Sequence, residues 1–235
     1  MLGLAGLEGT YEKIRADRDA LSETMSGLRA GEWHGLNVTM PLKEEAARLS
    51  DRLSPLAERS RSVNTLAAED QHIAGHSTDS TAFTTLLEDS RFADMGTILL
   101  VGAGGSAAAA LAAIGGERRV YVAARRRAAA EKLTARFGGE VVAWGAAVAG
   151  SLVINSTPLG MKGESLPGVT LSASAGLIDL PYGQVPTPAM VEAANLEVPT
   201  ANGHEFLVLQ AIESFRLWTG VQIAYPDLLA ALRNV

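Results

Sequence analysis

The sequence predicts an α/β fold with two domains, and three observations support it. Short apolar runs of strand length alternate with helical patterns along most of the chain. One such run, Ile98 to Val101, breaks into a glycine cluster and then into an alanine-rich stretch, Ala107 to Ile114, which is typical of a strand, a tight turn and a helix. A separate set of strands and helices comes before it, so we expect an N-terminal α/β domain at 1–92 and a Rossmann-like domain that begins at 93.

The N-terminal domain is expected to begin with a strand followed by a helix, at Thr10 to Ala16 and Asp19 to Leu28. A second strand, His34 to Thr39, leads into Pro41, which suits the first turn of a helix running from Lys43 to Leu49.

Two further strands are expected to pair across a polar turn, Ser62 to Ala68 with Ile73 to His76. The helix that follows runs to about Leu87, and Thr78 or Asp79 is expected to cap it.

The second domain continues the alternation of strands and helices. After the glycine cluster, its strands are expected at Arg119 to Ala124, Glu140 to Ala143, Ser151 to Asn155 and Gly176 to Asp179, with a helix at Ala128 to Phe137. A long helix from Gly203 to Gly220 and a last one at Tyr225 to Leu232 end the chain.

Composition excludes several classes of protein. The 235 residues are 47% hydrophobic and 20% charged with a net charge of −6, and acidic and basic residues are interspersed, so neither a nucleic acid nor a membrane is expected as a partner. The chain has no cysteine, which excludes disulfides, thiolate metal sites and a cysteine nucleophile; no metal site is expected. No signal peptide or membrane span is recognisable, and cytoplasm is the expected location.

The glycine cluster predicts a dinucleotide site. Glycines let the backbone turn sharply and approach a pyrophosphate, whose charge the N-terminus of the following helix favours. The alternative is a glycine-rich connection of no further function. The strand ending at Ala124 is followed by Arg125, Arg126 and Arg127, where an NAD-type domain would present a carboxylate to the ribose. Guanidinium groups suit a 2′-phosphate, so NADP is favoured over NAD, the alternative being a solvated basic turn.

Lys43 and Asp79 each allow two interpretations. A lysine in the first turn of a helix opposes the helix dipole, so it is either solvated or part of a site that uses its charge. Asp79 is either a helix cap or a functional carboxylate.

Taken together, six motifs resemble the shikimate dehydrogenase family in order and approximate spacing over nearly the whole chain. They are Asn37-Val-Thr-Met-Pro-Leu-Lys43, Val63-Asn-Thr65, Gly75-His-Ser-Thr-Asp79, Gly102-Ala-Gly-Gly-Ser-Ala107, Asn155-Ser-Thr-Pro-Leu-Gly-Met161, and Gln210 before Phe215 and Trp218-Thr-Gly220.

The resemblance implies NADP-dependent reduction of 3-dehydroshikimate to shikimate, a step of aromatic amino acid and chorismate biosynthesis, in a cleft between a substrate domain and an NADP domain. It also implies that 204–235 return to the substrate domain, which would then comprise 1–92 and 204–235, with the NADP domain at 93–203. Lys43 and Asp79 would be the catalytic pair: the ammonium stabilises and protonates the oxygen of the reduced ketone, and Asp79 positions the lysine and binds a hydroxyl. The substrate-binding residues would be Asn37, Thr39, Asn64, Tyr182 and Gln210.

The resemblance also implies which residues meet the cofactor. The loop from Ser156 to Met161 would line the nicotinamide pocket. The cofactor-binding residues would be Gly102, Ala103, Gly104, Gly105, Ser106, Ala107, Arg125, Arg126, Thr157, Met161 and Gly203.

One departure stands at the start of the sequence. The family places a strand and a Ser-x-Ser-Pro segment, which holds the carboxylate of shikimate, before the strand that Thr10 to Ala16 would match, and this sequence contains neither, so the substrate domain is expected to be incomplete. Three hypotheses follow: a shikimate dehydrogenase whose activity is reduced by that loss, a divergent oxidoreductase of the shikimate and quinate type acting on another small polyol, or a non-catalytic NADP-binding module. Either a monomer or a homodimer is compatible with each.

Overall fold

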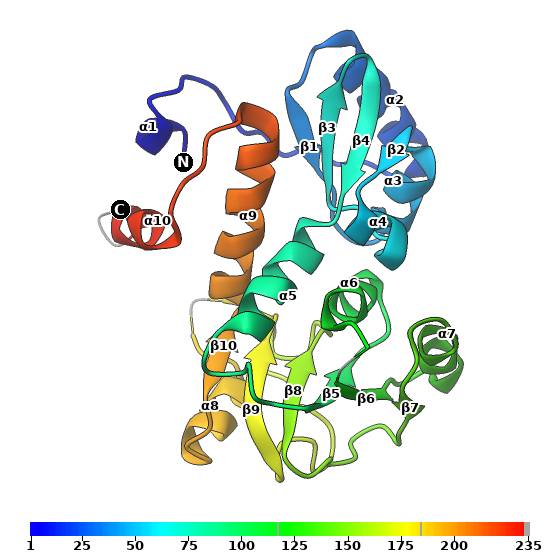
Figure 1. Cartoon of the computed structure of the whole chain (residues 1–235), viewed down its shortest axis with the longest axis vertical. Coiled ribbons are helices and arrows are strands. Elements are labelled where there is room, and N and C mark those ends of the chain that lie inside the picture. The colour runs from blue at the N-terminus through cyan, green and yellow to red at the C-terminus, as the bar shows by residue number, and fades with distance from the viewer. Residues whose placement is uncertain (117, 184, 233–235) are drawn as a thin grey trace. The chain divides into compact units, whose positions relative to one another are not determined.

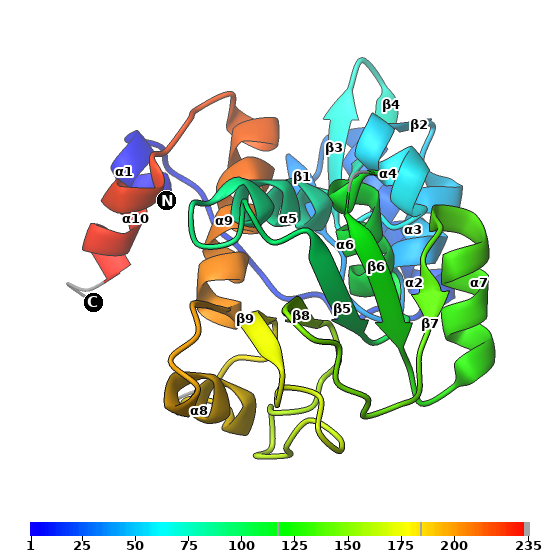
Figure 2. The ribbon, with the colours of Figure 1, turned by 60° about the horizontal axis from the view of Figure 1, so that its bottom comes forward.

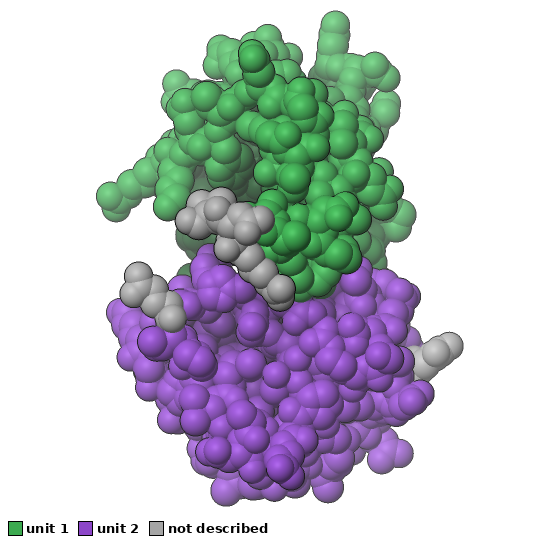
Figure 3. All heavy atoms as spheres, turned by 90° about the vertical axis from the view of Figure 1, so that its left-hand side faces the viewer, with its two compact units in different colours: residues 1–81, 208–235 green, residues 82–207 purple. Residues whose placement is uncertain are grey.

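The computed structural model describes residues 1–116, 118–183 and 185–232 and divides into two compact units. Unit 1 comprises residues 1–81 and 208–235, and unit 2 comprises residues 82–207; Figures 1 and 3 show the two. Each contains its own sheet, which confirms the two-part α/β fold that the sequence predicts.

Unit 1 is built on a four-stranded sheet of order β1-β3-β4-β2. The strands are β1 (Gly35–Asn37), β2 (Arg52–Leu53), β3 (Thr65–Glu69) and β4 (His72–His76). Its helices are α1 (Leu2–Ala5), α2 (Arg18–Ala30), α3 (Lys43–Leu49), α4 (Pro55–Ser60) and α10 (Tyr225–Leu232). Two further helices, α5 (Thr78–Glu88) and α9 (Gly203–Thr219), run from one unit into the other.

The expected hairpin is confirmed: β3 and β4 pair antiparallel, with Thr65 opposite His76 and Glu69 opposite His72. The two turn residues between them, Asp70 and Gln71, have positive φ angles of 47° and 67°, the conformation of the tight turns that join twisted antiparallel strands. The apolar faces of α2, α3 and the sheet meet in one core, which includes Met25, Leu28 and Leu66.

Unit 2 contains a six-stranded parallel sheet of order β10-β9-β8-β5-β6-β7, which Figure 1 shows. Figure 2 shows the strands from β9 to β7 from another side. The strands are β5 (Thr97–Val101), β6 (Arg119–Ala123), β7 (Glu140–Val141), β8 (Ser151–Asn155), β9 (Ser174–Asp179) and β10 (Thr200–Asn202). The helices are α6 (Gly105–Ile114), α7 (Arg127–Phe137) and α8 (Pro188–Asn195).

The central strands of unit 2 are covered on both faces. Every residue of β8 is buried, as are Ile98 to Val101 of β5, which explains why both strands read as continuous apolar runs rather than as alternating ones. From β5 the chain adds β6 and β7 on one side and β8, β9 and β10 on the other. The strand order therefore reverses between β5 and β8, and in open parallel sheets ligands bind at such a reversal, beyond the carboxyl ends of the strands.

The prediction of a strand at Thr10 to Ala16 is wrong. Residues 7–17 have no regular secondary structure, and Tyr11 and Ile14 are 69% and 46% exposed. A strand forms where a neighbouring edge supplies hydrogen bonds and a core covers one face. Within the described residues this segment pairs with neither outer strand of the four-stranded sheet, so its alternation of side chains finds no such partner.

The sequence pattern did not predict two short helices, α4 and α8. Each begins at a proline that directly follows an N-cap residue. In α4 the Ser54 side chain accepts a hydrogen bond from the backbone N–H of Ala57, and in α8 Thr187 does the same for Met190. Pro55 and Pro188 occupy the first helical positions, where their fixed φ and missing N–H cost nothing. No helix within the described ranges is long and apolar enough to cross a bilayer.

Candidate active site

Lys43 and Asp79 form an ion pair within unit 1. Lys43 is the first residue of α3, directly after the turn through Pro41, and its Nζ lies 2.6 Å from Oδ2 of Asp79. The two side chains are 16% and 6% exposed, so the pair is largely removed from water. A charge-assisted bond of this length holds the ammonium in one place, and the solvated interpretation of Lys43 does not apply.

Asp79 is free to make this contact because another residue caps its helix. The Ser77 hydroxyl accepts the backbone N–H of Ser80 at 3.4 Å, the pattern of an N-cap residue bonding three positions ahead. The expectation that Thr78 or Asp79 caps α5 is therefore wrong. Asp79 lies in the first turn, where the helix dipole favours a carboxylate and its side chain is directed at Lys43 rather than at its own backbone.

Asn64 connects this pair to a long helix. Its Nδ2 donates to Asp79 Oδ1 at 3.1 Å and to Gln210 Oε1 on α9 at 3.2 Å, and its Oδ1 accepts the backbone N–H of Asp79 at 3.3 Å. Asn64 is 4% exposed, so its amide is held in one orientation by buried partners. The side chains therefore present a fixed cation next to fixed neutral amides.

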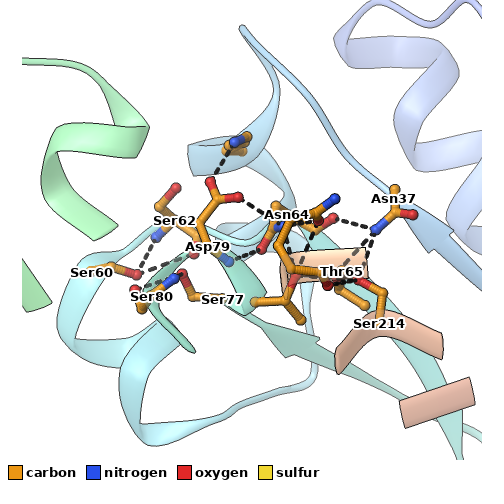
Figure 4. Close-up of polar contacts among 12 residues, drawn as sticks. Asn37, Ser60, Ser62, Asn64, Thr65, Ser77, Asp79, Ser80 and Ser214 are labelled. Carbon is orange, nitrogen blue, oxygen red and sulfur yellow. Dashed lines mark hydrogen bonds and ion pairs between the residues drawn. The ribbon is translucent and has the colours of Figure 1, made fainter. Parts of the chain in front are cut away.

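A cluster of hydroxyl groups continues from Asn64, as Figure 4 shows. Ser214 of α9, which is 1% exposed, bonds to the Thr65 hydroxyl at 2.8 Å and to the Thr78 hydroxyl at 3.2 Å. The Asn37 Nδ2 donates to Ser214 Oγ at 3.1 Å, and the Asn37 Oδ1 accepts the Tyr11 hydroxyl at 2.9 Å. An ordinary tyrosine hydroxyl is protonated at neutral pH, so Tyr11 is the donor of this bond.

Five of the seven catalytic and substrate-binding residues predicted from the sequence thus lie in one hydrogen-bonded group: Asn37, Lys43, Asn64, Asp79 and Gln210. Thr39 lies outside it, on the exposed turn between β1 and α3, where its carbonyl accepts the N–H of Leu42 at 2.9 Å. Tyr182 belongs to unit 2, is 44% exposed, and packs on His204 with ring centroids 5.3 Å apart.

The chemistry of this group suits a small polar substrate. A lysine ammonium donates and transfers protons, whereas neutral amides and hydroxyls both donate and accept, which is what hydroxyl and carbonyl oxygens require. Because the protein already satisfies most of these groups, their positions do not depend on a ligand.

The predicted cofactor-binding residues of unit 2 follow the carboxyl ends of its parallel strands. The glycine loop follows β5, Arg125 and Arg126 follow β6, Thr157 and Met161 follow β8, and Gly203 follows β10. We call this side of the sheet the carboxyl edge. The neighbouring strands are aligned there, with Val101 opposite both Ala123 and Asn155, so the loops leave the sheet side by side.

Gly102 shapes the first of these loops. Its φ of 118° lies in the region that side chains disfavour, and a Cβ at this position would come 2.4 Å from the Ser156 Oγ. The Ser156 hydroxyl and N–H both bond to the Val101 carbonyl, at 2.8 and 2.9 Å. The glycine loop and the loop after β8 therefore lie in contact at the point where the strand order reverses.

The N-terminus of α6 fits a phosphate group. Gly104 is its N-cap and forms no side-chain cap, so the first backbone N–H groups of the helix lack the partner that a serine or aspartate would give. Gly104 is exposed, and a Cβ there would meet no atom within 4 Å, which leaves room for a ligand to approach the backbone.

The carboxyl edge is also basic. Arg125 and Arg126 are exposed, and no ion pair or hydrogen bond of their side chains is found in the described part of the chain, whereas Arg127 pairs with Glu131 at 2.9 Å. The two arginines are thus available to an anionic ligand at the end of β6.

Gly203 is required by a close backbone approach rather than by its φ angle. A Cβ there would lie 2.2 Å from the Leu180 carbonyl oxygen and 2.7 Å from that of Pro181. Met161 is 56% exposed and lies at the end of the loop that Thr157 begins.

Sequence reasoning missed two groups of residues. In unit 1 these are Tyr11, Thr65, Thr78 and Ser214. Thr65 and Thr78 stand in two of the motifs, which could have indicated them, whereas no motif contains Tyr11 or Ser214. In unit 2 they are Asn155 and Asp179, both 0% exposed, for which a signal did exist: each is a polar residue that ends an otherwise apolar strand.

Comparison with known families gives one match to a family model. Residues 1–66 match the shikimate dehydrogenase substrate binding domain. These residues include Asn37, Lys43 and Asn64 of the group described above.

Curated relatives and solved structures agree with this match. The chain is 36% identical to the NADP⁺ shikimate dehydrogenase of Alkalilimnicola ehrlichii, over 95% of this chain and 87% of the relative, and 34% identical to that of Mesorhizobium japonicum, over 97% and 85%. The crystal structure of the Thermus thermophilus enzyme in complex with NADP(H) and shikimate superposes with a TM-score of 0.89 at 30% identity, covering 99% of this chain and 90% of that one.

Proposed function

The chain belongs to the shikimate dehydrogenase family, and we propose that it catalyses the NADP-dependent interconversion of 3-dehydroshikimate and shikimate. The observation that carries this proposal is the buried pair of Lys43 and Asp79 set among neutral amides and hydroxyls. We assign substrate binding to unit 1 and cofactor binding to unit 2.

Lys43 acts on the oxygen of the substrate. Reduction of a ketone builds negative charge on its oxygen, and a fixed ammonium both stabilises that charge and supplies the proton. In the reverse direction the same nitrogen accepts the proton of the hydroxyl. Lys43 performs this role because Asp79, 2.6 Å away, holds its Nζ in place without a water molecule between them.

Asp79 and the amides bind the hydroxyl groups of the substrate. Asp79 has a second oxygen, which Asn64 holds at 3.1 Å, and accepts a substrate hydroxyl next to the reacting carbon. Asn37, Thr39, Asn64 and Gln210 contact the remaining hydroxyls. A site of fixed hydroxyl partners discriminates strongly against analogues that lack a hydroxyl, because its buried polar groups are then unpaired.

The carboxyl edge of unit 2 holds NADP. The uncapped N-terminus of α6 and the exposed Gly104 bind the pyrophosphate, and Arg125 and Arg126 bind the 2′-phosphate. Thr157, Met161 and Gly203 lie on the loops assigned to the nicotinamide half. When bound, NADPH supplies the hydride; the residues of the chain orient it and supply the proton.

The test measures turnover and binding on the same preparation. NADPH oxidation is followed by the absorbance of the reduced nicotinamide with 3-dehydroshikimate as substrate, and NADPH affinity is measured by fluorescence titration without substrate. We expect turnover with NADPH and at least tenfold less with NADH. NADPH binding without turnover on 3-dehydroshikimate would contradict the proposed activity and support a binding module, and turnover on another polyol alone would identify a divergent enzyme.

A further inference from the structure

A buried carboxylate at the end of β9 has no part in the function assigned so far. Asp179 is 0% exposed and accepts two hydrogen bonds, one from Asn155 Nδ2 at 2.6 Å and one from the Thr187 hydroxyl. Asn155 ends the neighbouring strand β8, and Thr187 is the N-cap of α8. Asp179 therefore lies between two structures, the loop after β8 on one side and a helix on the other.

The bonds of Asn155 fix which way its amide points. Its Oδ1 accepts both the backbone N–H of Thr157 at 3.1 Å and the Thr157 hydroxyl at 2.7 Å. The Nδ2 must then donate elsewhere, and it meets Asp179 together with the Leu159 carbonyl at 3.0 Å. With both ends of the amide engaged, Asn155 cannot flip without losing several buried bonds.

The loop after β8 takes its shape from this amide. Thr157 in turn holds Leu159, because its hydroxyl also accepts the backbone N–H of Leu159 at 3.1 Å. The first turn of the loop is thus closed by bonds that all lead back to Asn155, and through it to Asp179. On its other side the same loop contacts Gly102 through Ser156, so a change in its path alters the carboxyl edge itself.

We propose that Asp179 is a positioning residue of the dinucleotide site, which it serves by holding Asn155 and thereby the loop through Thr157. This rests on the proposed function in one respect, that NADP binds at the carboxyl edge of unit 2. Asp179 acts through Asn155 and contacts neither cofactor nor substrate. The arm through Thr187 leads to α8 instead and serves only the structure of the unit.

The negative charge of Asp179 is disfavoured by burial, and the two hydrogen bonds that the carboxylate accepts oppose this effect. Burial raises the pKa of the Asp179 carboxyl above its ordinary value, and the bonds from Thr187 and Asn155 oppose that rise. A carboxyl whose pKa is higher in the folded chain than in the unfolded chain stabilises the fold less as pH rises through its pKa.

The two arms of the carboxylate supply matched variants. Asp179→Ala removes both bonds, Asn155→Ala removes the loop arm alone, and Thr187→Val removes the helix arm alone. Asp179→Asn keeps an acceptor for the amide of Asn155, because the Thr187 hydroxyl can turn to accept from the new amide whereas Asn155 cannot turn.

The decisive readout is the affinity for NADPH measured by fluorescence titration, with no 3-dehydroshikimate present. We expect Asp179→Ala and Asn155→Ala to weaken NADPH binding at least tenfold, their double variant to weaken it no further, and Asp179→Asn and Thr187→Val to stay within threefold of the unmodified chain. Thr187→Val lowers the melting temperature without this loss of affinity.

Equal losses in Asn155→Ala and Thr187→Val, or unchanged binding in Asp179→Ala, would overturn the proposal. If Asp179→Ala does not fold, Asn155→Ala and Asp179→Asn decide by the same criteria. Because the titration contains no substrate, the ranking of the variants does not depend on turnover. If the variants rank as expected and the unmodified chain shows no turnover, only the proposed activity is contradicted. If the unmodified chain binds no NADPH, the proposed activity and the role of Asp179 are both contradicted.

Discussion

In unit 1 the side chains proposed for catalysis hold one another, whereas at the carboxyl edge of unit 2 the groups proposed to bind the cofactor have no side-chain partners within the described residues. Asp79 and Asn64 are buried, the side chain of Lys43 is 16% exposed, and Asp79 bonds to both of the others. Gly104, Arg125 and Arg126 are exposed, and the first N–H groups of α6 have no side-chain cap.

This difference reflects two kinds of chemistry. Proton transfer requires a group fixed to within a fraction of an ångström, and Lys43, the proton donor that we propose, is held by Asp79 without a substrate. Binding a large anionic cofactor requires donors that gain their partners from the ligand, so an uncapped helix and unpaired arginines suit it. The bonds that fix the carboxyl edge lie one layer below, at Asn155 and Asp179.

Asp79→Asn tests the fixed region and has the largest expected effect. The variant keeps the shape of the side chain and removes its charge, so Lys43 loses the partner that holds it. We expect kcat to fall by about 10²- to 10⁴-fold, the range for loss of general acid–base catalysis. NADPH affinity, measured by titration, should remain within about twofold, since Asp79 lies in unit 1. A kcat within threefold of the original would show that the pair is structural.

Two glycine variants test which parts of the carboxyl edge are rigid. Gly102→Ala combines a disfavoured φ with a contact of 2.4 Å, and should lower the free energy of unfolding by about 2 kcal/mol or more. Gly104→Ala should lower it by less than about 1 kcal/mol, because its Cβ meets nothing.

The two glycine variants should also differ in the cause of any loss of NADPH affinity. Gly104→Ala places a methyl group where the pyrophosphate approaches the backbone, so its affinity falls although the fold persists. Chemical denaturation and NADPH titration measure the two quantities. Equal stability of both variants would contradict the assignment of Gly102 to the turn and Gly104 to the ligand.

Arg125→Gln tests the open region through cofactor choice. Loss of a charge-assisted bond to the 2′-phosphate, worth about 1.5–3 kcal/mol, should raise the KM for NADPH by roughly 10- to 100-fold and leave the KM for NADH unchanged. Arg127→Gln is the matched control, because Arg127 already pairs with Glu131. Equal effects of Arg125→Gln on both cofactors would assign it another role.

The smallest effect is expected for His76→Gln, on the pH dependence of the free energy of unfolding. Burial lowers the pKa of His76 from its ordinary value, and the nearby Glu69 carboxylate, 3.7 Å away, opposes that shift. The unfolded chain therefore takes up the proton first, so the free energy of unfolding falls as pH drops below about 6.5. His76→Gln should remove that part of the slope, as denaturation between pH 5 and 7 would show. Parallel curves for both chains would contradict it.

The strongly patterned elements were predictable from the sequence. The structure confirms the hairpin of β3 and β4, the strands β5 and β8 and the helix after the glycine loop. Each of these elements buries one face or both, and this burial requires a pattern of apolar residues that is recognisable in the sequence. Residues 10–16 show the limit: seven alternating residues predict a strand only if a neighbouring edge exists, and that is a property of the whole fold.

The candidate site was predictable where a motif carried it and not where hydrogen bonds did. Lys43, Asp79 and Asn64 stand in motifs, and the structure brings them together. Ser214 joins Thr65 from 149 positions away, a contact that no local pattern records. The capping of α5 by Ser77 likewise depended on which of three adjacent polar residues the backbone geometry selects.

The most direct test of the central claim is the turnover of Lys43→Met, measured with saturating NADPH and 3-dehydroshikimate beside Lys132→Met, an exposed lysine of α7. We expect Lys43→Met to lose about 10²-fold or more in kcat, to bind NADPH normally and to fold, and we expect Lys132→Met to be unaffected. A Lys43→Met chain that turns over within a few fold of the original would contradict the assignment of Lys43 as the proton donor.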